Sequence, residues 1–465
     1  MSSNDEKLIA TYDKWYSLKK EIANINNLPI EKRSNDLPKL ESEANDLEKE
    51  LTRSSSVLSD FNSSLNVNWK DIQTQLKPNE AALEFTHFKY NKDSVLYCAL
   101  VIKKDSEFPV MVQLFEEMQL ANLLTNLKEN NNYAVTSVYG SKQFTETKLY
   151  DVIWKPLEQH LKGVEIINYS PSGLLHKVSF SALSNADDHY LIDDYKLNML
   201  TTTAMLTKST QSVFDKNTEV TLFGGINYSM NDTSQKPWNY LAGTLSETEQ
   251  LNNIFLKQGL KVNYIKAKDA TKQEFKSLAA NSNIIHIATH GFFFPEPPII
   301  KTEADENKAI NDIVSRSASR AVELNYIRND NPLMRSGLVF AGVNDYWNGI
   351  TEHIDSNGIL TALEVVNIDL RKNKLVVLSA CETGLGDIRD GEGVYGLQRA
   401  FKMAGTENII MSLWQVPDKE TSEFMQIFYG LLFTEQNINQ AFTETQNLMR
   451  KKYDPYYWAA FVLVR

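Results

Sequence analysis

Residues 284–291 have the sequence IIHIATHG, and residues 375–381 have the sequence LVVLSAC. Each stretch is a nearly continuous apolar run that ends in a side chain able to transfer protons or acyl groups. Runs of this kind, without polar alternation, are typical of strands buried on both faces. Similar runs at 220–223, 261–265 and 408–413 alternate with helical patterns. The sequence therefore predicts an α/β fold, a mostly parallel sheet with helices on both faces.

The chain is expected to have three parts: a helical N-terminal region at 1–75, an α/β lead-in at 76–144, and a domain at 145–465 on which the lead-in packs. The helical prediction depends on two apolar stripes at helical spacing, Leu8, Tyr12, Trp15, Leu18 and Ile22, then Leu37, Leu40, Ala44, Leu47 and Leu51. Two interpretations of this region stay open, a structural cap and the stump of a helical-repeat array.

Local motifs predict several boundaries. Ser-x-x-Glu and Thr-x-x-Glu capping boxes predict helix starts at Ser246 and Thr271. The turn at 171–173 is expected to lead into a hairpin strand over 174–180. The Pro-, Ser- and Asn-rich stretch 294–358 is predicted to be a long irregular loop that binds substrate or regulates the domain.

Composition excludes several classes of protein. The chain has 465 residues, 42% hydrophobic and 23% charged, with a formal net charge of −11 and no basic run, which argues against direct binding of nucleic acid. No stretch approaches the roughly 20 apolar residues of a membrane span, so a cytoplasmic location is expected. The two cysteines, Cys98 and Cys381, are too few for a disulfide framework or a cysteine-based metal site. Cys98 lies within an apolar run and is predicted to be a core residue.

His290 and Cys381 follow two strands of the predicted sheet, where the carboxyl ends of parallel strands meet. A thiol becomes a strong nucleophile when a neighbouring base removes its proton, so this pair is the minimum for acyl transfer. The backbone N–H groups of Gly291 and Cys381 are candidates for an oxyanion hole. His286 lies on the same strand within an apolar run, and we expect it to be buried and hydrogen-bonded while His290 acts as the base.

The segments HIATHG (286–291) and LSACETG (378–384) closely resemble the CHAT family, caspase-like cysteine peptidase domains often associated with tetratricopeptide repeats. The likeness extends over roughly residues 145–465, through GEGV (391–394), RAF (399–401), AG (404–405), SLW (412–414), VPD (416–418) and YWAAF (457–461). One departure is VSF at 178–180, where the family motif usually carries Pro before Phe. No period of about 34 residues is visible, so the repeats themselves are not expected in this sequence.

The resemblance implies a caspase–hemoglobinase fold in which His290 is the catalytic base and Cys381 the nucleophile, with no metal or cofactor. It also implies regulated cleavage of selected partner proteins, often in bacterial antiviral defence or cell death, with a repeat region or another protein as activator. Asp418 follows Trp414 and Val416 as in separases of the same clan, where the acid receives a basic substrate side chain. Two interpretations of Asp418 stay open, this pocket and a simple helix cap.

Three functions compete at this point. The first is a cysteine endopeptidase, which the intact pair of His290 and Cys381 favours. The second is a catalytically quiet protein-interaction module, and the third is hydrolysis of a small acyl compound by the same pair.

Overall fold

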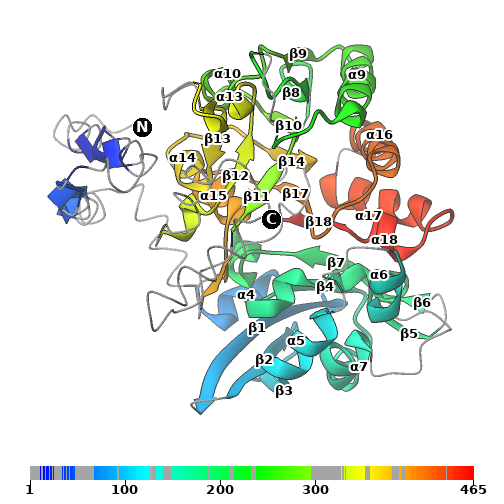
Figure 1. Ribbon diagram of the computed structural model, residues 1–465. Helices are drawn as coiled ribbons and strands as arrows, with labels where there is room; N and C mark the ends of the chain where they lie inside the picture. Colours follow the sequence, from blue (N-terminus) through cyan, green and yellow to red (C-terminus); the bar gives the residue numbers. More distant parts are fainter. Residues whose placement is uncertain are drawn as a thin grey trace.

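We analysed a computed structural model of the whole chain (Figure 1). From residue 67 onward it describes the chain except 92–93, 126, 128–131, 140–147, 187–188, 209–213, 232–236, 295–325, 327–328, 330, 351–356, 380–386, 390–392 and 436. Before residue 67 it describes part of the segment 11–47.

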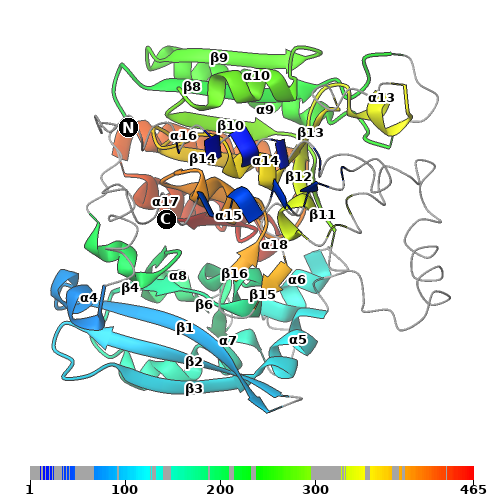
Figure 2. The ribbon, with the colours of Figure 1, turned by 90° about the vertical axis from the view of Figure 1, so that its left-hand side faces the viewer.

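An eleven-stranded sheet forms the centre of the described structure. Figure 2 shows the sheet from β9 at the top to β3 at the bottom. Its strands, in spatial order, are β3 (Val110–Glu116), β2 (Ser94–Lys103), β1 (Glu80–Asn91), β4 (Ile166–Ser170), β7 (Lys196–Met199), β18 (Phe461–Val464), β17 (Ile409–Ser412), β14 (Leu375–Ser379), β10 (Ile284–Ala288), β8 (Glu219–Ile226) and β9 (Lys261–Ala267).

Most neighbouring strands in this sheet are parallel. The antiparallel pairs are β1–β2, β2–β3 and β17–β18. Strands β10 and β14 are completely buried along their whole length, as their continuous apolar sequences predict.

Helices cover both faces of the sheet. One face carries α9 (Ala242–Lys257), α16 (Asp418–Glu435) and α17 (Ile438–Met449), on the right in Figure 1. The other face carries α10 (Lys272–Ala279), α14 (Ala362–Val366) and α15 (Leu397–Met403), on the left. The predicted α/β class, with a mostly parallel sheet between two helical layers, is confirmed.

The lead-in segment belongs to the same sheet as the rest of the chain. After α4 (Trp69–Gln75), its strands β1–β3 extend the sheet through the parallel pair β1–β4. Helices α5 (Glu117–Thr125), α6 (Asn132–Tyr139) and α7 (Leu149–Ile153) follow. One hydrophobic core therefore runs from the lead-in to the C-terminal strand.

Before residue 67, the described residues between 11 and 25 and between 37 and 47 are helical, as predicted. Leu18, Ile22 and Ala44 form a small core of their own, and Lys14 pairs with Glu43 across the two segments. Part of this region, including Leu8, Tyr12 and Leu51, lies outside the described residues. No helix in the described part of the chain is long and apolar enough to span a membrane.

A second, three-stranded sheet projects from the carboxyl edge of the main sheet. It consists of β11 (Gly291–Phe293), β12 (Ser336–Val339) and β13 (Ile359–Thr361), and the short helix α13 (Val343–Trp347) follows β12. The prediction of an irregular loop over 294–358 was wrong for β12 and α13, whose residues are buried. Residues 295–325 of that stretch lie outside the described residues.

Two local predictions were also wrong. Residues 174–180 form no hairpin strand; they belong to the 3-10 helices η4 (Gly173–Lys177) and η5 (Phe180–Ala182) and to the two residues between these helices. Helix α9 begins at Ala242 rather than at Ser246, because Thr244, in its first turn, already bonds the backbone N–H of Gly225. The other predicted start is correct, since the Thr271 side chain accepts from the N–H of Glu274.

Candidate active site

The carboxyl ends of β10 and β14 meet at one edge of the main sheet. The two strands are parallel and adjacent, and Ala288 is paired with Ser379. His290 follows Ala288 by two residues, and Cys381 follows Ser379 by two residues along the sequence. Cys381 itself lies outside the described residues, so the geometry of the site is built from the histidine side.

A backbone carbonyl orients the imidazole of His290. Its Nε2 lies 2.8 Å from the carbonyl oxygen of Asn239. A carbonyl oxygen can only accept, so Nε2 carries the proton and Nδ1 holds the lone pair in the neutral ring. This is the tautomer in which Nδ1 is the base.

Aromatic rings shield the same imidazole. The ring centroids of Tyr228 and Trp238 lie 5.1 Å and 5.4 Å from that of His290. Burial lowers the pKa of His290 below its ordinary value, while the Asn239 carbonyl and the nearby Asp418 carboxylate act in the opposite direction. The ring is therefore neutral at pH 7, the state that a general base requires.

Hydrogen bonds fix the backbone on both sides of the strand end. The Thr289 hydroxyl donates to the carbonyl oxygen of Val339 at 2.6 Å and lies 3.0 Å from the hydroxyl of Tyr228. The N–H of Val339 donates to the carbonyl oxygen of His290 at 3.1 Å. The small sheet thus holds His290 from its backbone.

Gly291, the other oxyanion-hole candidate of the predicted site, begins β11 and pairs with Leu338 of β12. Gly291 is partly exposed. A glycine at this point leaves the strand end uncovered by a side chain.

Asp418 is the first residue of α16, and its side chain is exposed. It lies against the first turn of α9, where a Cβ on Gly243 would overlap the carboxylate of Asp418. The carbonyl of Pro417 already accepts the first helical hydrogen bond, from Thr421, so Asp418 lies one residue inside the helix rather than at the capping position. Its charge acts on His290 and opposes the lowering of the pKa of that imidazole by burial.

His286 has the buried, hydrogen-bonded position that we expected. Its ring is completely buried, with Nε2 2.8 Å from Oε1 of Glu247 in α9 and Nδ1 3.2 Å from the hydroxyl of Tyr429 in α16. It therefore ties the sheet to the helices of one face and lies apart from the partners of His290.

The sequence reasoning missed Asn239, Tyr228 and Trp238. Asn239 acts through its backbone, which no side-chain pattern reveals. The two aromatic residues lie in the segment between β8 and α9, where nothing in the spacing pointed to His290.

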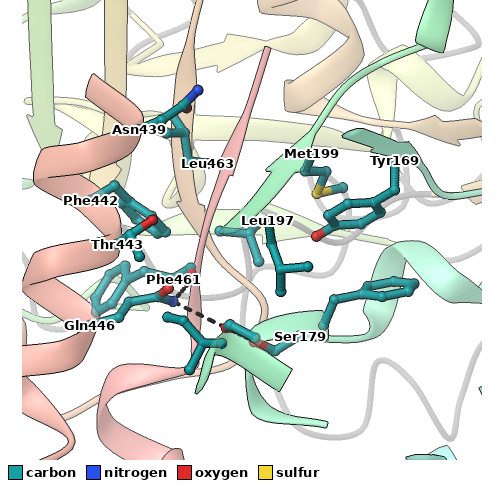
Figure 3. A pocket seen from close by; sticks show the side chains of 14 residues that line it. Tyr169, Ser179, Leu197, Met199, Asn439, Phe442, Thr443, Gln446, Phe461 and Leu463 are labelled. Atoms are coloured by element: carbon teal, nitrogen blue, oxygen red, sulfur yellow. Dashed lines mark hydrogen bonds between the residues drawn. The ribbon is translucent and has the colours of Figure 1, made fainter. Parts of the chain in front are cut away.

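A cavity among the described residues lies away from His290 (Figure 3). It lies between α17, β18 and η5, where Gln446 donates to the Ser181 hydroxyl and to the carbonyl oxygen of Phe461, both at 3.3 Å. None of its lining residues contacts His290. Among the described residues, no group of three or more His, Cys, Asp or Glu side chains is arranged to hold a metal ion.

The CHAT domain family model matches residues 144–465. The chain therefore belongs to the CHAT family, and this membership, with the observed sheet, confirms the caspase-like fold class that the motifs predicted.

The curated relatives share a short segment. Over 109 residues the chain is 31% identical to human (Homo sapiens) and 29% identical to mouse (Mus musculus) tetratricopeptide repeat protein 28. This segment is 23% of this chain and only 4% of each relative.

Two solved structures resemble the chain at low identity. The separase of the Saccharomyces cerevisiae separase–securin complex gives a TM-score of 0.48 at 10% identity, over 94% of this chain and 32% of separase. The Arg-specific cysteine proteinase gingipain R gives a TM-score of 0.39 at 8% identity, over 74% of each chain.

Proposed function

We propose that this chain is a caspase-like cysteine endopeptidase with His290 as general base and Cys381 as nucleophile. The observation that carries the proposal is the parallel register of β10 and β14, in which Ala288 pairs with Ser379. The two strands therefore end side by side at the carboxyl edge of the sheet, and each candidate residue follows its paired position by two residues in the sequence.

The reaction follows from the tautomer of His290. Nδ1 accepts the proton of the Cys381 thiol, and the thiolate attacks the carbonyl carbon of a peptide bond. The backbone N–H groups of Gly291 and Cys381 bind the oxyanion of the tetrahedral intermediate. The intermediate expels the amine, which takes the proton from Nδ1. Water, deprotonated by the same nitrogen, then hydrolyses the thioester and restores the thiol.

The charge of Asp418 supports a preference for a basic side chain before the scissile bond. Its carboxylate is exposed at the start of α16 and acts electrostatically on His290, which supports a role for it in binding the substrate. An arginine or lysine of the substrate would pair with it there.

We further propose that the substrates are selected proteins and that a protein activator or a tetratricopeptide-repeat region regulates the cleavage. Membership of the CHAT family and the short match to tetratricopeptide repeat protein 28 support this part. A cytoplasmic role in bacterial antiviral defence or cell death belongs to the same proposal.

The test is covalent labelling of Cys381 by a peptide-based thiol-reactive probe. His290→Ala should reduce the rate by about 10²–10⁴, the usual contribution of a general base. Cys98→Ala is the matched control, because Cys98 is buried in β2 and should not affect labelling.

A panel of probes tests the specificity. Asp418→Asn should slow a probe with a terminal Arg by about fivefold, since an exposed ion pair contributes up to about 1 kcal/mol, and should leave a Leu probe unchanged. Labelling that does not depend on His290 would refute the peptidase and favour the catalytically quiet interaction module.

A further inference from the structure

The segment between β8 and α9 provides the carbonyl that orients His290, and helix α13 holds this segment at both of its ends. The segment runs from Asn227 to Leu241, with 232–236 outside the described residues. At its beginning, the carbonyl oxygen of Tyr228 accepts from the N–H of Asn344 at 2.9 Å. At its end, Trp238 contacts the same helix through its backbone and its ring.

Asn344 binds both backbone groups of Trp238. Its Oδ1 accepts from the N–H of Trp238 at 3.0 Å, and its Nδ2 donates to the carbonyl oxygen of Trp238 at 3.0 Å. Nδ2 also donates to the Ser229 hydroxyl at 3.0 Å. Since the residue is only 1% exposed, water does not compete for these bonds.

The contact with Trp238 fixes the peptide plane that precedes the Asn239 carbonyl. The carbonyl of Trp238 belongs to the peptide plane that leads to Asn239, and the Asn239 carbonyl accepts from Nε2 of His290. With that plane fixed by Asn344, only the two backbone torsions of Asn239 separate the fixed plane from the carbonyl that accepts from the imidazole.

Two neighbours in α13 reinforce the arrangement. The Asp345 carboxylate, 2% exposed, accepts from the N–H groups of Met230 at 2.7 Å and Asn231 at 3.3 Å. The ring of Trp347 packs edge-on against that of Trp238, with centroids 5.7 Å apart. Because α13 directly follows β12, which bonds the backbone of His290, the ring and the backbone of His290 are held by one continuous piece of chain.

We propose that Asn344 is a positioning residue for the imidazole of His290, acting through Trp238 and the Asn239 carbonyl. The inference rests on the proposed function for the chemistry of His290, but its geometry can be tested without any activity. Asn344 does not touch the reacting atoms; it acts by holding the segment whose Asn239 carbonyl accepts from Nε2 of His290.

The experiment uses the full chain labelled with [15N]histidine. The chain has seven histidines, and the His290 signals are assigned by their loss in His290→Gln. Wild type should show a directly observable Nε2–H signal for His290, because the hydrogen bond and the aromatic cover slow exchange with water. In Asn344→Asp, a carboxylate oxygen faces the Trp238 carbonyl in place of the N–H donor, and exchange of Nε2–H should be on the order of tenfold faster, the effect of one lost hydrogen bond.

Asn373→Asp is the matched control. Asn373 is equally buried and also donates to backbone carbonyls, those of Ser282 and Asn283, but it precedes β14 at the opposite edge of the sheet. The His290 signal should be unchanged in this variant. An unchanged signal in Asn344→Asp, or an equal loss in both variants, would overturn the proposal.

Two further measurements keep the test decisive if Asn344→Asp does not fold. Asn344→Ala removes the amide without adding a charge and should give the same loss. In wild type, the backbone N–H of Trp238 should exchange slowly with deuterium although it lies outside helix and strand, and fast exchange there would refute the inference.

Labelling of Cys381 by the peptide probe should slow on the order of 10²-fold in the Asn344 variants, the cost of a misplaced catalytic group. A changed ring signal without any labelling in wild type would refute the peptidase and leave the positioning role intact.

Discussion

Removal of Lys272 should destabilise the protein far more than removal of Lys276, although both lysines bind the same oxygen. Lys272 Nζ lies 3.2 Å and Lys276 Nζ 2.8 Å from Oε1 of Glu364, and Lys272 also donates to Oδ1 of Asn357 at 2.7 Å. The side chain of Lys272 is 1% exposed, whereas that of Lys276 is 37% exposed. Because both residues are lysines that bind the same carboxylate oxygen, a comparison of the two substitutions tests the effect of burial on the strength of the ion pair.

The expected magnitudes follow from that difference. Lys272→Met leaves the buried Glu364 carboxylate with one partner fewer and should lower the free energy of unfolding by about 3 kcal/mol. Lys276→Met removes a half-exposed charge and should cost about 0.5 kcal/mol. Urea unfolding followed by tryptophan fluorescence measures both. Costs that agree within about 1 kcal/mol would refute the reasoning, since the standard estimates for buried and exposed pairs differ by more.

The pH dependence gives an independent check. Burial raises the pKa of Glu364, but the charges of Lys272 and Lys276 oppose it and hold the pKa below its ordinary value. A lowered pKa means that this contribution to stability is present above about pH 4.3 and is lost as the pH falls through the folded-state pKa. The difference between wild type and Lys272→Met should therefore shrink in acid, and a difference that grows below pH 4 would contradict the assignment.

Two other outcomes are expected. Because burial lowers the pKa of His290, the labelling rate of Cys381 should fall in acid with a midpoint below the ordinary histidine value of about 6.5, and a midpoint above it would contradict the neutral buried ring. Gly349 and Gly358 both have a positive φ, of 70° and 68°, but a Cβ would meet open space at Gly349 and the backbone N of Val343 at 2.6 Å at Gly358. Gly349→Ala should cost about 1 kcal/mol and Gly358→Ala at least twice that, measured by urea unfolding, and equal costs would show that crowding is not the cause.

The central strands could be predicted because strands buried on both faces have continuous apolar sequences. Strands β10 and β14 begin at the first residues of the two predicted apolar runs, 284 and 375, and the side chains that follow these runs made His290 a candidate from the sequence. Helix α13 could not be predicted in this way. It has five residues, and its stability comes from buried polar contacts of Asn344 and Asp345 with a segment more than a hundred residues away.

The other failures have similar causes. The motif at Ser246 has the letters of a capping box, but the position of the helix start is decided by packing on β8 rather than by a local pair. The run 174–180 is apolar enough for a strand, yet Gly173, with φ of 56°, turns the chain beneath the hydroxyl of Tyr97, and a 3-10 helix results. The local sequence therefore predicted which segments form helices and strands in most of the domain, whereas long-range contacts determined the residues at which several of these elements begin and end.

The position of β18 has a consequence for the assembly of the sheet. This strand, Phe461–Val464, lies between β7 and β17 and joins the strands of the lead-in side to those that carry the candidate site. Only a few backbone contacts among the described residues join β18 to β7. Val464 pairs with Met199, the N–H of Arg465 donates to the carbonyl oxygen of Met199, and the carbonyl oxygen of Arg465 accepts from the N–H of Thr201. Without β18 in place, the main sheet would consist of two parts, one ending at β7 and the other at β17, each with an open edge. The continuity of the sheet therefore depends on the placement of one four-residue strand, and any change that loosens these few bonds would weaken the connection between the two parts of the sheet.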